Sequence, residues 1–265
     1  MSIRLVVVDI DGTLLDDDLV LNPQLKRKVN ELRCRDVGFT LATGRVFASA
    51  RLLGEKLGLD LPLIANGGAV VQTVRGQSLS HLVLTPQLVI DALDHTESWP
   101  AQRYLLTREC IYAETGGHHA QNYGKRLGVS VKVVGDLKQL AAESITQLVI
   151  RISSQEAGDM STSTERMFAG RLAVQQTMPH LIEFMHQDAS KGKALSLLAS
   201  ALGLASEHIM AVGDGINDLD MLDVAGLGVL VGNADPRLWE RADIVTKAHC
   251  DQGVIEALKS FVKMG

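Results

Sequence analysis

Apolar, strand-like runs alternate with helical patterns along most of this chain, and this alternation constrains the fold most. The first run, IRLVVVDI at residues 3–10, precedes a helix that should begin at Asn22 and Pro23, a capping residue followed by proline. Further core elements follow in the same alternation: a strand at 38–44, a helix over about 45–57, a strand at 61–68, a helix from near Ser190, a strand at 208–214, a helix around 217–222 and a strand at 226–233. This order predicts a doubly wound, Rossmann-like α/β core with a mostly parallel sheet.

A middle interval of the chain breaks this alternation. It contains one apolar helical pattern, several short strand candidates and a polar, Ser/Thr-rich helix candidate near 155–168. This change of pattern predicts two domains. Residues 1–84 and 187–265 would form a discontinuous core domain, and residues 85–186 would form an α+β cap domain inserted into it.

The composition excludes several classes of protein. Hydrophobic residues make up 46% of the chain and charged residues 22%, which is typical of a globular protein with a sizeable core. The formal net charge of -5, without a Lys/Arg-rich cluster, argues against nucleic acid or an anionic membrane surface as the main partner. The three scattered cysteines form no CxxC pair, which argues against a zinc site or a disulfide framework. Without a signal peptide or a membrane span of roughly 18 apolar residues, we expect a cytoplasmic protein.

Polar residues suited to chemistry follow three of the expected strands. Asp9 ends the first strand, Thr43 ends the second, and Asp214 ends the strand at 208–214. Because right-handed crossovers bring the carboxyl ends of parallel strands to one edge of the sheet, these side chains should gather in one crevice. Asp9 and Asp11 are two residues apart, so the period of a strand directs both carboxylates to the same side, and Gly12 permits a sharp turn after them.

Several carboxylates at one place repel each other unless a cation lies among them. Their oxygen ligands suit Mg²⁺, which usually keeps some waters and shares its coordination with substrate phosphate. With that neutralisation, Asp9 could attack phosphorus in line, and Asp11 could protonate the leaving oxygen and later deprotonate water. Thr43, with the backbone N–H that follows it at an expected helix start, would bind phosphate oxygens. Lys191 would supply a positive charge to the transferring group.

The same residues resemble the haloacid-dehalogenase-type phosphohydrolases, specifically the Cof-type sugar-phosphatase group. Four motifs of that family are matched in the expected order: DxDGTLL at 9–15, TGR at 43–45, the lysine of an SKGxAL segment at Lys191, and GDGxND at 213–218. IANGGA at 64–69 and VGNA at 231–234 also resemble that group. The large insertion between the second and third motifs is the place of the α/β cap in this family.

The resemblance implies a role for each matched residue. Asp9 would be nucleophile and metal ligand, and Asp11 would be the acid/base that also binds Mg²⁺ through its backbone carbonyl. Asp214 would supply a metal carboxylate, with Asp218 in support through water or through Lys191. Contacts to phosphate are implied for the Ile10 backbone, Thr43, Gly44, Lys191 and Asn217. The implied reaction is the Mg²⁺-dependent hydrolysis of a small-molecule phosphate ester, such as a sugar phosphate.

Two other functions are compatible with parts of this pattern. A hexose-phosphate mutase can use the same scaffold and the same aspartyl-phosphate. A non-enzymatic phospho-receiver or ligand-binding module also presents an aspartate at a strand end. However, such a receiver would be about half this length and would carry its phosphoacceptor on a later strand. The individual motifs also have simpler explanations, since GDGIND at 213–218 could be a tight turn with a helix N-cap.

Overall fold

A computed structural model describes residues 2–16 and 18–261 of the chain. It divides into two units. The first unit comprises the chain up to Gly44, the segment Ala50–Ser80 and the chain from Ser190 onward; the second comprises Arg45–Ser49 and His81–Ala189. That these units act as a catalytic core and a cap stays a prediction.

The segment Arg45–Ser49 belongs to the second unit, although the sequence analysis placed it in the core domain. The reason is apolar packing. Val46 and Ala48 are buried in a cluster with Tyr104 and Leu106 of the second unit, and the Ala48 N–H donates to a carbonyl of the same unit. The second unit also begins at His81 and ends at Ala189, a few residues outside the expected 85–186.

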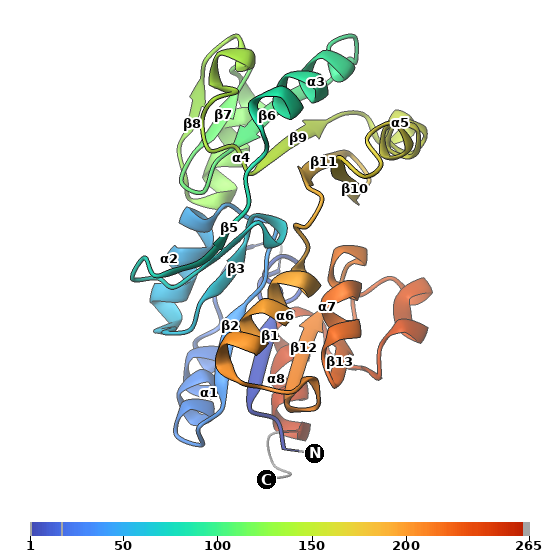
Figure 1. Ribbon diagram of the computed structural model, residues 1–265. Coiled ribbons are helices and arrows are strands. Elements are labelled where there is room, and N and C mark those ends of the chain that lie inside the picture. Colours follow the sequence, from blue (N-terminus) through green and yellow to red (C-terminus); the bar gives the residue numbers. More distant parts are fainter. Residues whose placement is uncertain (1, 17, 262–265) are drawn as a thin grey trace. The chain divides into compact units, whose positions relative to one another are not determined.

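Five parallel strands form the central sheet of the first unit, in the order β14-β13-β12-β1-β2. Figure 1 labels four of them, β13, β12, β1 and β2. The strands are β1 (Leu5–Val8), β2 (Gly38–Leu41), β12 (Ile209–Gly213), β13 (Leu227–Leu230) and β14 (Ile244–Val245). Every residue of β1 is 0% exposed. A central parallel strand is covered on both faces, which explains why this run is apolar without alternation. The doubly wound, mostly parallel core predicted from the sequence is confirmed.

In the described part of the first unit, the α-helices are α1 (Pro23–Arg33), α6 (Lys191–Leu202), α7 (Leu219–Val224), α8 (Cys250–Phe261) and most of α2 (Phe47–Leu57), whose first three residues belong to the second unit. α6 and α7 cover one face, where their apolar side chains pack in one cluster with Leu5 and Val7 of β1. α1 contacts α8. The start of α1 agrees with the sequence analysis, because Asn22 accepts a hydrogen bond from the Gln24 N–H at 2.8 Å.

A small sheet of three strands, β3 (Leu63–Ala65), β4 (Val70–Gln72) and β5 (Ser78–His81), was not predicted beyond its first strand. The short 3₁₀ helix η1 (Asn66–Gly68) joins β3 to β4. An isolated parallel bridge between Ala42 and Ile64 lies just beyond the end of β2. This contact places the turn after β3 near the carboxyl ends of the central strands.

The second unit contains a sheet of six strands in the order β10-β11-β9-β6-β7-β8. The strands are β6 (Gln102–Leu106), β7 (Ile111–Ala113), β8 (Val131–Val133), β9 (Gln147–Arg151), β10 (Leu172–Met178) and β11 (Leu181–His186). All described pairs are antiparallel except β7 with β8. This confirms the predicted α+β character of the insertion.

Three α-helices belong to the second unit: α3 (Pro86–Thr96), α4 (His118–Leu127) and α5 (Ser154–Met167). Phe168 and Phe184 pack edge to face in an apolar cluster of this unit, at a centroid distance of 5.8 Å. Neither α4 nor β7 was predicted from the sequence. Among residues 2–16 and 18–261, no helix has both the length and the apolar character that a membrane span requires.

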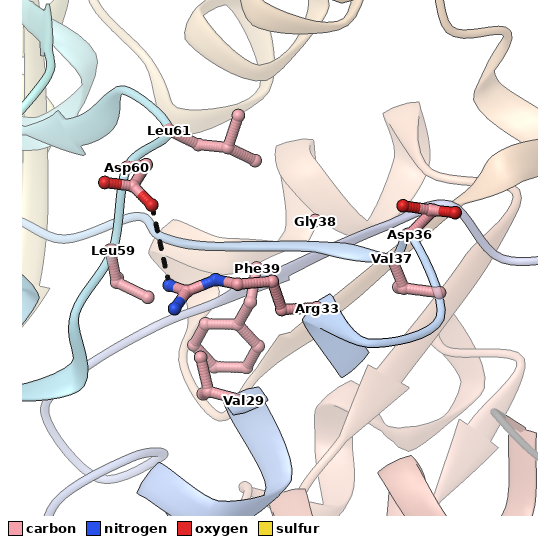
Figure 2. A pocket seen from close by; sticks show the side chains of 9 residues that line it. All are labelled: Val29, Arg33, Asp36, Val37, Gly38, Phe39, Leu59, Asp60 and Leu61. Atoms are coloured by element: carbon pink, nitrogen blue, oxygen red, sulfur yellow. Dashed lines mark ion pairs between the residues drawn. The ribbon is translucent and has the colours of Figure 1, made fainter. Parts of the chain in front are cut away.

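A pocket of about 270 Å³ opens in the first unit at the amino-terminal end of β2 (Figure 2). Apolar side chains such as Phe39 and Leu61 line it, and Arg33 pairs with Asp60 beside it at 3.7 Å. None of the residues selected by the sequence motifs contributes to its lining. Gly38 lies at the amino end of β2, whereas the motif residues follow the carboxyl ends of their strands. The pocket therefore lies at the opposite edge of the sheet from the motifs.

Gly226→Ala should destabilise the first unit. An ideal Cβ on Gly226 would lie 2.5 Å from the Cα of Glu207 and 2.7 Å from the carbonyl oxygen of Ser206. The backbone would have to move, and such overpacking typically costs about 1–3 kcal/mol. Gly158→Ala is the matched control, because its Cβ would meet no atom within 4 Å and it lies in α5. Thermal unfolding checks this, and an unchanged midpoint for Gly226→Ala would contradict the described packing.

Candidate active site

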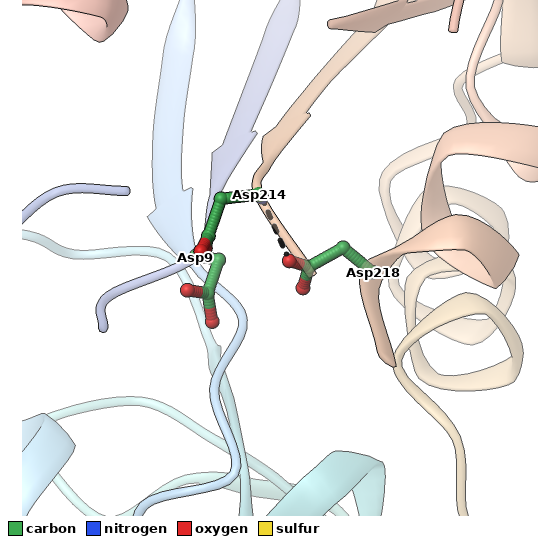
Figure 3. A group of neighbouring side chains, drawn as sticks. All are labelled: Asp9, Asp214 and Asp218. Atoms are coloured by element: carbon green, nitrogen blue, oxygen red, sulfur yellow. Dashed lines mark hydrogen bonds between the residues drawn. The ribbon is translucent and has the colours of Figure 1, made fainter. Parts of the chain in front are cut away.

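Three carboxylates meet where the central strands end. Asp9 follows β1, Asp214 follows the neighbouring strand β12, and Asp218 ends the short 3₁₀ helix η4 (Ile216–Asp218). One oxygen atom from each lies within 4.8 Å of the other two (Figure 3). We call Asp9, Asp214 and Asp218 the carboxylate cluster. The parallel pairing of β1 with β12 thus brings together residues about 200 positions apart in the sequence.

Lys191 connects two members of the carboxylate cluster. Its Nζ donates hydrogen bonds of 2.6 Å to Oδ1 of Asp9 and of 2.6 Å to Oδ1 of Asp218. The three side chains are buried, with exposed fractions of 2% for Lys191, 6% for Asp9 and 1% for Asp218. Charge-assisted bonds of this kind are strong because water does not compete with them. One ammonium group nevertheless faces three carboxylates, so the cluster retains an excess of negative charge.

Both oxygen atoms of Asp218 already accept hydrogen bonds. Oδ1 accepts from Lys191, while Oδ2 accepts from the backbone N–H of Asp214 at 3.0 Å and of Gly215 at 2.9 Å. These contacts fold the loop from Asp214 to Asp218 around the Asp218 carboxylate. The role of Asp218, as a metal ligand or as a support for the other ligands, stays a prediction.

The crowding of charge shifts the ionisation of the cluster. Burial raises the pKa of Asp9 well above its usual range; the Lys191 charge opposes this, and the neighbouring carboxylates add to it. Burial also raises the pKa of Asp214 to about 6; the charge of Asp218 adds to this shift and the hydrogen bond from Thr13 opposes it. Burial alone would lower the pKa of Lys191, but Asp218 and Asp9 raise it overall. A cation among these carboxylates would relieve their repulsion.

The turn after β1 brings Gly12 against Asp214. Gly12 has φ of 82°, a left-handed conformation that favours glycine, and its N–H donates to the Leu15 carbonyl at 2.9 Å. An ideal Cβ on Gly12 would lie 2.4 Å from Oδ2 of Asp214. The carbonyl of the buried Ile10 accepts from N–H groups later in this turn. The half-buried Asp11 lies in the same turn, and its carboxylate is not part of the carboxylate cluster.

Thr43 and Gly44 follow β2, the strand on the other side of β1. Thr43 is 1% exposed; its N–H donates to the Ile64 carbonyl at 2.9 Å and its carbonyl accepts from Gly67 at 3.0 Å. The helix predicted over about 45–57 is present as α2, which begins at Phe47, so the Gly44 N–H precedes its first turn. An ideal Cβ on Gly44 would meet no atom within 4 Å, so space is open beside it.

Asn217 lies inside η4, and an ideal Cβ on Gly215 would lie 2.5 Å from its Oδ1. Its side chain therefore turns back over the loop that carries Asp214. A role in binding phosphate stays a prediction for Asn217, as it does for Ile10, Thr43 and Gly44.

Two further residues contact the site although the sequence analysis gave them no role. The Thr13 hydroxyl donates to Oδ1 of Asp214 at 2.7 Å. Asn233 donates from Nδ2 to the Gly12 carbonyl at 2.8 Å and accepts from the Cys250 N–H at 2.7 Å. Thr13 belongs to the DGT run and Asn233 to the VGNA run, so membership in a motif was the signal that could have identified both.

Comparisons with known proteins agree with this geometry. The chain matches the haloacid dehalogenase-like hydrolase family over residues 6–258. It is 30% identical over 272 residues to a protein of Streptococcus pyogenes serotype M6, covering 99% of each chain. It is 29% identical over 265 residues to the HMP-PP phosphatase of Serratia proteamaculans, covering 95% of this chain and 92% of that one.

Its fold is similar to that of a haloacid dehalogenase-like hydrolase from Bacteroides thetaiotaomicron, with a TM-score of 0.87 and 21% identity over 98% of this chain and 99% of that one. The family match and the sequence relatives span both units, and they confirm the resemblance to the Cof-type group. They also favour an enzyme over the non-enzymatic alternative. The chain therefore belongs to the haloacid dehalogenase-like hydrolases, and it is a phosphatase of that family.

Proposed function

We propose that this phosphatase uses Mg²⁺ and hydrolyses a small phosphorylated metabolite, a sugar phosphate or a similar ester, through an aspartyl-phosphate on Asp9. One observation carries the proposal. The buried Asp9 carboxylate directly follows β1, Lys191 binds one of its oxygens at 2.6 Å, and an oxygen of Asp214 lies within 4.8 Å of an Asp9 oxygen. A buried nucleophile next to a fixed cation and an acidic cluster suits phosphoryl transfer, in which positioning and electrostatic stabilisation dominate.

The residues present fit Mg²⁺ as the cation. They offer carboxylate oxygens, the ligand type that Mg²⁺ prefers, and Lys191 balances only part of their negative charge. Asp9 and Asp214 would bind the ion with their carboxylates, and Asp11 with its backbone carbonyl. Asp218 would support them through its bonds to Lys191 and to the Asp214 N–H. When bound, the ion neutralises the carboxylates and the phosphoryl group so that two anions can approach each other.

In the first step, a carboxylate oxygen of Asp9 forms a bond to phosphorus while the bond from phosphorus to the leaving oxygen breaks. Asp11, in its protonated form, gives its proton to that leaving oxygen, and the alcohol product departs. Lys191 stabilises the charge on the transferring group. The backbone N–H groups of Ile10 and Gly44, with the Thr43 hydroxyl and Asn217, would fix the other phosphoryl oxygens.

In the second step, a water molecule attacks the aspartyl-phosphate. Asp11, now a carboxylate, accepts a proton from this water, and the bond between phosphorus and the Asp9 oxygen breaks. Inorganic phosphate leaves, Asp9 returns to its carboxylate form and Asp11 is again protonated. A mutase would instead transfer the phosphoryl group to another hydroxyl, so release of free phosphate separates the two reactions.

All groups in these steps come from the first unit. We propose that the second unit selects the substrate through the leaving group. A screen of phosphorylated metabolites for phosphate release would identify the substrate class.

Asp9→Asn should lower turnover by several orders of magnitude while the fold survives, because an amide is a poor nucleophile. The exposed Asp60→Asn, at the opposite edge of the sheet, is the matched control. Asp11→Asn should lose on the order of 10²–10⁴-fold in turnover of esters with poor leaving groups.

Asp11→Asn also provides a direct test of the intermediate. p-Nitrophenolate leaves without protonation, so this variant should complete the first step on p-nitrophenyl phosphate and stall at the second. Mass spectrometry should then detect a phosphoryl group on Asp9. Near-wild-type activity of Asp9→Asn would exclude an aspartyl-phosphate at this residue.

Chelation should abolish activity, and Mg²⁺ should restore it. Ca²⁺ should substitute poorly, because its larger and looser coordination misplaces the nucleophile against phosphorus. Asp214→Ala should raise the Mg²⁺ concentration needed for half-maximal activity, whereas Asp223→Ala, an exposed aspartate paired with Arg241, should not. Titration of activity with Mg²⁺ measures both effects. Full activity of the wild-type protein in excess chelator would contradict the proposed metal.

Gly12→Ala should lower turnover by about 10²-fold, because its Cβ would push the Asp214 carboxylate from its place. Gly76→Ala is the matched control for backbone strain. Gly76 also has a positive φ, 93° against 82° for Gly12, but its Cβ would meet no atom within 4 Å. Steady-state kinetics of both variants separates the effect of the contact between the new Cβ and Asp214 from the effect of backbone strain at a positive φ. Equal losses in the two variants would show that contact with Asp214 is not the cause.

A further inference from the structure

Lys191 needs a fixed backbone as well as a fixed ammonium group. It is the first residue of α6, and the whole residue, backbone included, is 3% exposed. Its long side chain has many rotamers, so two hydrogen bonds at its tip position Nζ reliably only if the helix start cannot move. The contacts around residues 190–192 therefore decide where this charge lies.

Asp220 binds the backbone next to Lys191. Its Oδ2 accepts a hydrogen bond of 2.8 Å from the Gly192 N–H, which is one of the N–H groups that the first turn of a helix leaves without an intrahelical partner. The Ser190 hydroxyl oxygen accepts from the next N–H, that of Lys193, at 3.1 Å. A carboxylate at this end of α6 also interacts favourably with the helix dipole.

The carboxylates of Asp218 and Asp220 come from one short stretch of chain. Asp218 ends η4 and Asp220 lies in the first turn of α7. One binds the ammonium group of Lys191 and the other binds the backbone of the residue after it. This stretch therefore fixes both ends of the lysine.

Close backbone packing restricts the same segment on two sides. An ideal Cβ on Gly192 would lie 2.4 Å from the carbonyl oxygen of Asp220, so α6 and α7 touch at this glycine. On another side, Gly68 has φ of 97° and a Cβ there would lie 2.2 Å from the Ser190 carbonyl oxygen. The start of α6 is thus enclosed between α7 and the turn after β3.

Asp220 uses one of its two carboxylate oxygens for a hydrogen bond within the described part of the protein. Its Oδ1 is buried and, among the residues that the structure describes, accepts no hydrogen bond. Leaving a buried carboxylate oxygen without a donor is unfavourable. The hydrogen bond from the Gly192 N–H to Oδ2 is therefore the contact that explains an aspartate at position 220.

The first backbone N–H groups of α6 already have acceptors within the protein. The N–H groups of Gly192 and Lys193 are bound within the protein by Asp220 and Ser190. They are therefore not offered to a phosphate group, and α6 contributes to phosphate binding through the ammonium group of Lys191.

We propose that Asp220 is a positioning residue for Lys191. It anchors the first turn of α6 to α7, and thereby directs the ammonium group onto Asp9 and the transferring phosphoryl group. This inference rests on the function proposed above for Lys191. It assigns Asp220 no contact with the substrate.

Turnover of p-nitrophenyl phosphate by variants of the full chain tests the proposal. Asp220→Ala should lower kcat by about 10- to 100-fold, since displacement of a catalytic group by about 1 Å can cost 10²-fold. Asp220→Asn keeps an acceptor oxygen and should recover most of that loss. Asp223→Ala removes an aspartate from the same helix, without a bond to α6, and is the matched control. If Asp220→Ala does not fold, Asp220→Leu, which is similar in size and lacks an acceptor, replaces it.

A double-mutant cycle with Lys191→Ala separates positioning from a general loss of stability. If Asp220 acts through Lys191, Asp220→Ala should change kcat by less than twofold when Lys191 is already alanine. An equal loss in both backgrounds, or no recovery in Asp220→Asn, would overturn the proposal. Full turnover of Lys191→Ala would instead overturn the proposed function of Lys191.

The same double-mutant cycle can be measured through the affinity for inorganic phosphate, which requires no turnover. Calorimetric titration of phosphate in the presence of Mg²⁺ should show weaker binding in Asp220→Ala than in the wild type. The double variant should bind phosphate as Lys191→Ala does. This second measurement decides the question if Lys191→Ala has no measurable activity, and additive losses in affinity would overturn the positioning role.

Discussion

The buried contact of Lys191 with Asp9 and Asp218 is the interaction on which the rest of the site depends. Both bonds are 2.6 Å long, and all three side chains are nearly inaccessible to water. A buried ion pair contributes little net stability, but removal of one partner leaves an uncompensated charge and is strongly unfavourable. The geometry of the strand ends therefore has to satisfy this contact, and the fold brings its members from the beginning and the last third of the chain.

The proximity of these residues could be predicted from the sequence, because it follows from the topology of the sheet. Parallel strands joined by right-handed crossovers align their carboxyl ends, so residues after β1, β2 and β12 share one edge. Asp9, Thr43 and Asp214 occupy those positions, and the doubly wound core followed from the alternation of strand and helix patterns. The four motifs then indicated the family. The predictions succeeded where a local pattern and a general rule of connection were both available.

The sequence was less informative where packing between distant segments decides the structure. No local pattern shows that Val46 and Ala48 pack with Tyr104 and not with the core domain. The polar, glycine-containing stretch of α4 was not predicted as a helix, because its apolar residues are few; Ala120 and Leu127 are buried in a cluster with strand residues such as Tyr104. The role of Asp220 could not be predicted for the same reason. Its partner is a backbone N–H, and every residue type except proline has that group.

The site also explains why glycine occurs at particular places in the motifs. Gly12 allows the turn after β1 to approach the Asp214 carboxylate, and Gly213 allows Asp218 to lie over the end of β12, since a Cβ there would be 2.5 Å from that of Asp218. Each glycine lets a carboxylate come closer to the strand ends than a larger residue would. The density of negative charge at this edge thus depends on backbone contacts. Lys191 offsets only part of this charge, so the packing of the strand ends determines the electrostatics of the site.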